Sequence, residues 1–207
     1  MAKVLTAAVA ENLSQIVEQH QLLPRNHFGG RLGQSTIDTV YYLTNRISMA
    51  WRKNKVVSAL SLDIEGALAN VILTRLIHNL KKRRISTAII NFMKTLLTNR
   101  RTRLKFNDFL SETISVTNRI GQGDPLSMLL YILYNTDLLE IPTNTEKKDA
   151  IGYVDDTTLL AIAESFEGTT KILEKMMTRE EGGIQWSNNY NSRFEVYKLA
   201  IAHFSRK

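Results

Sequence analysis

The sequence has no cysteine, and it has only three prolines among its 207 residues. The lack of cysteine excludes disulfide bonds, thiolate metal ligands and a catalytic thiol. No apolar run approaches the roughly 20 residues that a helix needs to cross a bilayer, because charged or polar residues interrupt every stretch. Since 43% of the residues are hydrophobic, the chain is long enough for one compact domain with its own core.

Charge is the second general feature. The net charge of +7 and the pI near 9.6 favour a polyanionic partner, because each phosphate that a cation neutralises releases condensed counterions. Solvated lysines and arginines that bind nothing would give the same balance. The charge therefore agrees with nucleic-acid binding without establishing it.

The first ten residues have some features of a minimal signal peptide, with Lys3 before an apolar stretch and Ala8-Val9-Ala10 at its end. An amphipathic helix explains them better, and an intracellular protein is expected. Apolar residues at helical spacing continue past Glu11: they are Val4, Leu5, Val9, Leu13, Ile16 and Val17.

The hydrophobic pattern along the chain predicts an α+β fold, an antiparallel sheet with helices on one face. Strands are expected at residues 56–62, 101–106, 113–117, 151–154, 157–163 and 199–204. Helices are expected after the capping residues Ser35, Asn70, Ser86 and Asp124, and over residues 166–177. Asn107-Asp108 and Asp155-Asp156 would lie at the turns of two hairpins.

Carboxylates follow or join three of these strands. Asp63 comes directly after the buried strand 56–62, and Asp155-Asp156 lie at a hairpin tip. Carboxylates that converge on one sheet need cations, and Mg²⁺, which prefers oxygen ligands, suits them. Two such ions can activate an attacking 3′-hydroxyl and stabilise a leaving pyrophosphate oxygen. Ordinary turn chemistry is the alternative explanation of an Asp-Asp pair.

Three segments carry a joint signature. Ala150–Asp156 contains Tyr-x-Asp-Asp, Leu62–Ala67 reads Leu-Asp-Ile-Glu-Gly-Ala, and Gly121–Ser127 reads Gly-Gln-Gly-Asp-Pro-Leu-Ser before a long apolar helix. Together and in this order they resemble the reverse transcriptases of non-LTR (LINE-type) retrotransposons. His27–Thr36 and Asn191–Phe204 extend the resemblance over nearly the whole chain.

The resemblance implies a fold and a function. Residues 56–207 would form the palm of a right-hand polymerase, and residues 1–55 partial fingers and the fingers-palm connection, without a thumb. The activity would be RNA-directed DNA polymerisation with two Mg²⁺ ions, an RNA template, a DNA primer and deoxynucleoside triphosphates, in the nucleus and without a membrane. The early fingers block, the thumb and the endonuclease of such enzymes have no counterpart in this sequence. A catalytically inactive nucleic-acid-binding remnant is therefore the alternative.

The resemblance also assigns roles residue by residue. The catalytic, metal-binding set would be Asp63, Asp155 and Asp156. Gln122 and Gly123 would line the nucleotide and template site, and Lys198 would lie near the leaving phosphate.

Two positions depart from the family pattern. Leu68 stands where relatives place an aromatic residue whose ring excludes a 2′-hydroxyl, and Tyr197 stands where a smaller residue is usual. Selectivity for deoxynucleotides is therefore open.

Basic residues gather at three places. Arg31, in a glycine-bearing loop, could approach a nucleotide or a phosphate backbone, although no Walker sequence follows it. Strand alternation would put Arg101, Arg103 and Lys105 on one face, as a stripe for the nucleic-acid backbone or as a merely solvated face. Leu104 and Phe106 would then point toward the core.

The third group, Lys81-Lys82-Arg83-Arg84, follows a predicted helix. Cations there interact favourably with the helix dipole, so a structural role explains them as well as nucleic-acid contact does. The histidines, His20, His27, His78 and His203, are far apart and expected to be structural. Trp51 and Trp186 are expected to pack in the core, with base stacking by Trp186 as the alternative.

Overall fold

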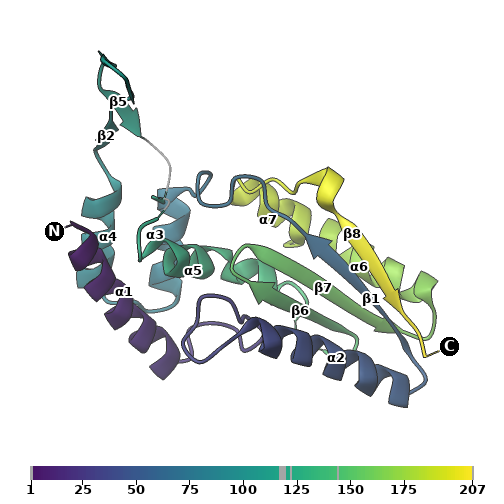
Figure 1. The fold of residues 1–207 in the computed structure, drawn as a ribbon. Coiled ribbons are helices and arrows are strands. Elements are labelled where there is room, and N and C mark those ends of the chain that lie inside the picture. Colours follow the sequence, from purple (N-terminus) through teal and green to yellow (C-terminus); the bar gives the residue numbers. More distant parts are fainter. Residues whose placement is uncertain (1, 117–119, 122, 144, 207) are drawn as a thin grey trace.

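The computed structural model describes residues 2–116, 120–121, 123–143 and 145–206. A four-stranded antiparallel sheet in the order β6-β7-β1-β8 forms its centre (Figure 1). The strands are β1 (Val56–Leu62), β6 (Lys148–Tyr153), β7 (Asp156–Ala163) and β8 (Ala200–Phe204). The predicted strand before Asp63, the hairpin and the last strand are thereby confirmed.

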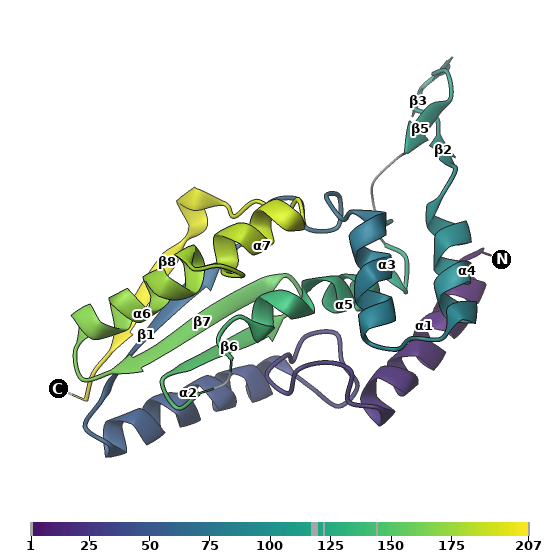
Figure 2. The same ribbon diagram turned by 180° about the vertical axis from the view of Figure 1, so that it is seen from behind.

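Helices cover both faces of this sheet, so the prediction of helices on one face only is wrong. Helix α2 (Thr36–Arg52) packs on one face, where Val57 and Ala59 join its core cluster. Helices α5 (Ser127–Glu140) and α6 (Phe166–Thr178) pack on the other face, where Leu60 and Leu62 lie (Figures 1 and 2). The reason is that β1 carries apolar residues on both of its faces, and successive side chains of a strand point to opposite faces.

Further helices pack around α5, which is buried along most of its length and is rich in leucine and tyrosine. They are α1 (Ala2–Gln19), α3 (Leu73–Lys82), α4 (Thr87–Leu97) and α7 (Gly183–Asn189). The predicted N-terminal amphipathic helix is confirmed, and α1 contributes Leu13 and Val17 to the larger core cluster. No helix in the described ranges is long and apolar enough to span a bilayer.

The helix starts are partly as predicted. Ser35 forms a capping box with Asp38 at the start of α2, and the Ser86 hydroxyl accepts a hydrogen bond from a backbone N–H of α4. Asn70 does not cap α3, because its Nδ2 donates to the Glu65 carbonyl (2.9 Å) and Ile72 is the N-cap residue of the helix. Helix α5 also begins later than predicted, and Asp124 Oδ1 accepts from the Leu126 N–H (2.9 Å) just before it.

Residues 100–116 form a two-stranded ribbon that projects from the body of the molecule beyond α4 (Figures 1 and 2). Its strands are β2 (Arg100–Thr102), β3 (Lys105–Phe106), β4 (Phe109–Leu110) and β5 (Ile114–Val116). The hairpin around Asn107-Asp108 is therefore confirmed. The expectation that Leu104 and Phe106 point toward the core is wrong: they are 47% and 64% exposed, since the projecting ribbon packs on no layer.

Candidate active site

The end of β1 and the turn between β6 and β7 lie side by side. Leu62, the last residue of β1, pairs with Thr157 of β7, so Asp63 follows the strand beside Asp156. Asp155 lies in the two-residue turn that joins β6 to β7. Pairing of the strands thus brings the three predicted aspartates to one end of one sheet.

Lys198 reaches the same end of the sheet from the short 3₁₀ helix η1 (Val196–Lys198). The preceding segment runs antiparallel to the residues after β1, with the Glu195 N–H donating to the Asp63 carbonyl (2.9 Å). Lys198 Nζ lies 3.1 Å from Asp63 Oδ2. The hydrogen bond and the charge of Asp63 raise the pKa of Lys198, so its ammonium is retained at neutral pH.

Asp156 shows that the carboxylates influence one another. Its partial burial, and then the negative charges of Asp155 and Asp63, raise its pKa above the usual aspartate value, while Lys198 opposes the shift. Like charges within reach of each other disfavour ionisation in this way. The site therefore concentrates more negative charge than the single lysine offsets.

Carboxylate oxygens with excess negative charge are the chemistry that a hard divalent cation requires. In this respect the aspartates fit the Mg²⁺ that the sequence predicts. As they stand, however, no three His, Cys, Asp or Glu side chains of the described part of the chain are arranged to hold a metal ion. The Lys198 ammonium lies on the Asp63 oxygen instead.

The turn that carries Asp155 is braced from below by a loop distant in sequence. The Phe28 N–H donates to the Gly152 carbonyl (2.8 Å), and the Gly152 N–H to the Asn26 carbonyl (2.9 Å). A Cβ on Gly29 would lie 2.5 Å from the Val154 nitrogen, so only glycine allows this approach. From α5, Asn135 Nδ2 donates to the carbonyl of Val154 (3.4 Å).

Two buried polar residues beneath the turn were not identified as important from the sequence. His27 lies against Gly152, and burial lowers its pKa to about 4, so its ring is neutral. Asp149 is buried, and it accepts from the Tyr42 hydroxyl (2.7 Å) and pairs with Arg46 Nε (2.8 Å). Both are structural, which agrees with the expectation for His27. Gly152, which directly precedes the Tyr-x-Asp-Asp sequence, was the one feature of the sequence that could have indicated a closely packed neighbour here.

Arg31 is engaged within the protein. Its Nε and one terminal nitrogen donate to the two carboxylate oxygens of Glu18 (2.8 and 2.7 Å). The other terminal nitrogen donates to the Pro24 and His27 carbonyls (2.8 and 2.9 Å). The guanidinium is directed at the loop that supports the turn and at α1.

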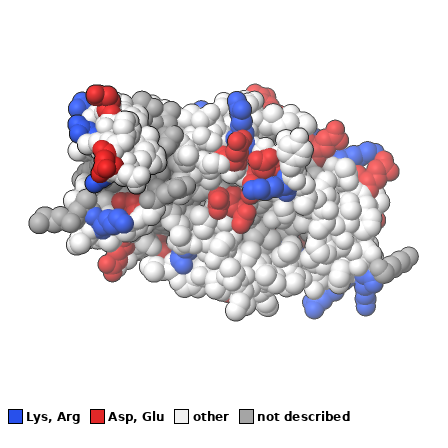
Figure 3. All heavy atoms as spheres, turned by 45° about the horizontal axis from the view of Figure 1, so that its top comes forward, with Lys and Arg blue, Asp and Glu red and all other residues white. Residues whose placement is uncertain are grey.

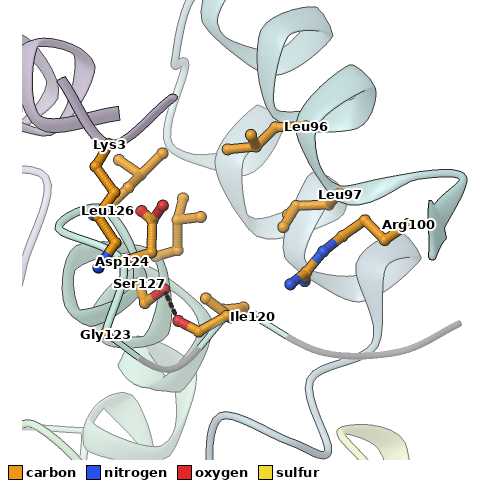
Figure 4. A pocket seen from close by; sticks show the side chains of 11 residues that line it. Lys3, Leu96, Leu97, Arg100, Ile120, Gly123, Asp124, Leu126 and Ser127 are labelled. Atoms are coloured by element: carbon orange, nitrogen blue, oxygen red, sulfur yellow. Dashed lines mark hydrogen bonds between the residues drawn. The ribbon is translucent and has the colours of Figure 1, made fainter. Parts of the chain in front are cut away.

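The predicted nucleotide site is described only in part, because Gln122 lies outside the described residues. Gly123 has a φ of +74°, and a Cβ there would meet open space. A pocket of about 220 Å³ lies at this glycine-rich segment (Figure 4), between α1 and α4. Lys3 and Arg100 extend toward it from opposite sides, and the Ser127 hydroxyl donates to the Gly121 carbonyl in its wall.

Leu68 is half-buried against the larger core cluster. Its carbonyl accepts from the Ile120 N–H (3.0 Å), which ties the segment after Asp63 to the start of the glycine-rich segment.

Asp156 also lines an open pocket of about 390 Å³ on the α2 side of the sheet. Apolar side chains, among them Val40 and Tyr153, share its wall with the hydroxyls of Thr36 and Thr39. This depression could not be predicted from the sequence, because it depends on α2 lying over that face of the sheet.

Apart from Lys198, the basic residues singled out in the sequence lie on other parts of the described fold. Lys82 and Arg83 pair with Asp137 (3.0 and 3.1 Å), so the structural explanation holds for these two. Arg101, Arg103 and Lys105 are exposed on the ribbon. Figure 3 shows acidic and basic side chains intermingled, and the described residues of that face form no single basic patch.

The packing interpretation of Trp186 is confirmed. The side chain is 5% exposed, and it stacks on Tyr190 with ring centroids 5.0 Å apart and planes 16° from parallel. It is therefore closed to a nucleic-acid base. His203 Nδ1 lies 2.7 Å from the Ser58 hydroxyl, a bond between β8 and β1 that agrees with a structural role.

Solved structures with this fold include telomerases at low sequence identity. Telomerase from Candida tropicalis in complex with a fragment of telomeric RNA matches with a TM-score of 0.72 and 13% identity, over 96% of this chain and 34% of that one. Apo telomerase of the same species, truncated from its C-terminal domain, matches with a TM-score of 0.68 and 14% identity, over 99% of this chain and 41% of that one. These matches concern the fold alone.

Curated relatives are transposon proteins. The probable RNA-directed DNA polymerase from transposon BS of Drosophila melanogaster is 28% identical over 138 residues, 67% of this chain and 15% of that protein. The retrovirus-related Pol polyprotein of the type-1 retrotransposable element R2 of Nasonia vitripennis is 27% identical over 180 residues, 84% of this chain and 17% of that protein. The chain thus spans about a sixth of the length of these relatives.

The sequence profile of the reverse transcriptase (RNA-dependent DNA polymerase) family matches residues 1–189. Together with the transposon relatives, it confirms the resemblance to non-LTR retrotransposon enzymes. The chain belongs to the reverse transcriptase family.

Proposed function

We propose that this chain carries the catalytic centre for RNA-templated DNA synthesis, in which a primer 3′-hydroxyl attacks a deoxynucleoside triphosphate and pyrophosphate leaves. Residues 56–207 would be the palm, and residues 1–55 part of the fingers and the connection to them. The observation that carries the proposal is the convergence of Asp63, Asp155 and Asp156 at one sheet end, where partial burial and then the charges of Asp155 and Asp63 raise the pKa of Asp156.

In this mechanism Asp63, Asp155 and Asp156 would hold two Mg²⁺ ions. Such ions, when bound, activate the attacking hydroxyl and stabilise the leaving oxygen. Lys198 has a role of its own, because its raised pKa keeps a proton on Nζ next to Asp63. Near the leaving phosphate this ammonium would neutralise negative charge and could donate that proton.

The nucleotide and template would lie along the glycine-rich segment. Open space at Gly123 lets a ligand approach the backbone, and Gln122 is proposed to act beside it. Leu68 would contact the sugar less effectively than an aromatic ring, so weak discrimination against ribonucleotides is expected. The contacts of Arg31 with Glu18 favour a supporting role over a nucleotide contact.

A non-catalytic nucleic-acid-binding protein is the second candidate. The observation that favours it is the ion pair of Lys198 with Asp63, in a site where no three acidic or imidazole side chains of the described residues are arranged to hold a metal. A binding protein would nevertheless gain nothing from carboxylates beside phosphate groups. Polymerisation is therefore preferred.

Primer extension on an RNA template with Mg²⁺ tests the proposal. Asp155→Asn should reduce incorporation of deoxynucleotides by roughly a thousandfold, the order of loss when an electrostatic group essential to a transition state is removed. Glu174→Gln, which changes an exposed carboxylate on α6, is the matched control and should leave the rate unchanged. Equal incorporation by the parent and Asp155→Asn would refute the site. No incorporation by the parent, together with RNA binding, would establish the second candidate.

A further inference from the structure

The ribbon of residues 100–116 has two chemically different faces. Alternation along its first strand puts Arg101, Arg103 and Lys105 on one face. Phe106 pairs with Phe109 across the turn, and directly opposed residues share a face. The tip therefore presents two aromatic rings on the face opposite the three cations.

A β-bulge lies midway along the ribbon. Thr102 pairs with Ile114, and Leu104 exchanges backbone and side-chain hydrogen bonds with Ser111. Two residues, Glu112 and Thr113, are thus opposed by Arg103 alone, whose Nε donates to the Thr113 hydroxyl (3.0 Å). Bulges increase the local twist, and this one lies opposite Arg103, the middle of the three cations.

The apolar side chains of the tip contribute little to the fold. All residues from 101 to 110 are exposed, and Phe106 and Phe109 keep 64% and 61% of their surface open. Apolar groups concentrated on a projecting element indicate a binding surface. At the base of the ribbon a pocket of about 380 Å³ is lined by Thr98, Asn99, Arg101 and Ser115, among others.

We propose that the ribbon binds single-stranded nucleic acid, with unpaired bases stacked on Phe106 and Phe109 and the phosphate backbone following the cationic face toward the base of the ribbon. Aromatic rings on one face of a narrow ribbon and a line of cations on the other give a single strand rings for its bases to stack on and charges for its phosphates, since every base has a stackable face. The charge of the segment favours nucleic acid over a protein as the partner. Its basic residues Arg101, Arg103 and Lys105 outnumber its acidic residues Asp108 and Glu112. The inference deepens the proposed function, because a polymerase that copies RNA must hold unpaired template.

Fluorescence anisotropy with a labelled, unstructured 20-nucleotide RNA and a duplex of equal length tests it on the full chain. Phe106→Ala with Phe109→Ala should weaken single-strand binding about tenfold or more and leave duplex binding within about twofold. Leucine at both positions, which keeps apolar surface without a ring, should weaken it similarly, and tryptophan at both should preserve it. Changing Arg101, Arg103 and Lys105 to glutamine should weaken both ligands and reduce the salt dependence of log K by up to about 2.

Matched controls separate the outcomes. Ile37→Ala with Tyr41→Ala removes apolar surface that is equally exposed on α2 and should not affect RNA binding. Unchanged affinity of the double leucine variant, or equal losses for single strand and duplex in the double alanine variant, would overturn the stacking proposal. A dimer of the parent that the double alanine variant dissociates would make the tip an interface between copies instead. Primer extension tests the catalytic proposal separately, because the anisotropy measurement reports RNA binding without turnover.

Discussion

The protein contains two hairpins with matching turns and opposite surroundings. The β6–β7 turn, Val154-Asp155, and the ribbon turn, Asn107-Asp108, each have a residue of positive φ followed by an aspartate, with φ of 57° at Val154 and 48° at Asn107. The first turn is braced by the loop at residues 26–29 and by α5, whereas the second is exposed. The two turns therefore have similar local conformations. They differ in tertiary packing: neighbouring elements hold the turn that carries Asp155, whereas the ribbon turn is open to solvent.

The largest difference between the hairpins should appear when a β-branched side chain is introduced into a strand of each of them. A Cβ at Gly152 would lie 2.6 Å from Leu139 Cδ1 and 2.7 Å from His27 Cδ2. Gly152→Val is therefore expected to lower the free energy of unfolding by about 3 kcal/mol, measured by urea denaturation. Ser115→Val on the exposed ribbon should change it by less than about 0.5 kcal/mol. Equal losses of stability in the two variants would mean that the close packing around Gly152 does not stabilise the β6–β7 hairpin.

Arg31→Met tests whether the loop beneath the catalytic hairpin is held by the ion pair with Glu18. Loss of hydrogen bonds to a charged, mostly buried partner should cost about 1–2 kcal/mol of stability, and Glu18→Gln should cost little more when Arg31 is already changed. Chemical denaturation of both single variants and the double variant measures this coupling. If Arg31→Met instead raised the KM for nucleotide and left the stability unchanged, a nucleotide contact by Arg31 would be supported.

The stability of the braced turn should depend on pH through Asp156. Because its pKa is raised, the folded protein binds a proton there more tightly than the unfolded chain does, so stability is lost as the pH rises through the folded-state pKa. Asp156→Asn cannot ionise and should raise Tm slightly at pH 7 in EDTA, with no gain near pH 3. An equal gain in Tm at pH 7 and at pH 3 would contradict the coupling of the three carboxylates.

The smallest effect on stability is expected at the tip of the ribbon. Phe106→Ala with Phe109→Ala should change the free energy of unfolding by less than about 0.5 kcal/mol, since exposed side chains lose little contact. Thermal melts of the parent and this variant provide the comparison. A loss above 1 kcal/mol would show that the tip packs on the fold and is not free to bind.

Features set by neighbouring residues could be predicted from the sequence. The Ser35 cap, the strand before Asp63 and both hairpins follow from patterns a few residues long. The position of α2 on the second face could not, because apolar alternation does not say which helix covers which side. The exposure of Phe106 was mispredicted because an apolar residue in a strand does not have to be buried.

The candidate site was predictable to a similar extent. Motifs indicated the aspartates, and strand pairing brings them together. The brace at Gly29, the contact of Arg31 with Glu18 and the position of Lys198 on Asp63 depend on residues remote in sequence. Such contacts appear only when the chain is folded.

The position of β1 between β7 and β8 bears on how the protein is made. One bond that fastens β1, from Ser58 to His203, joins residues 145 positions apart. A ribosome therefore releases β1 well before either neighbouring strand exists, and contacts of such long range form slowly. During that interval both edges of an apolar strand are open to aggregation, so synthesis of this protein should depend on chaperones more than its modest size suggests.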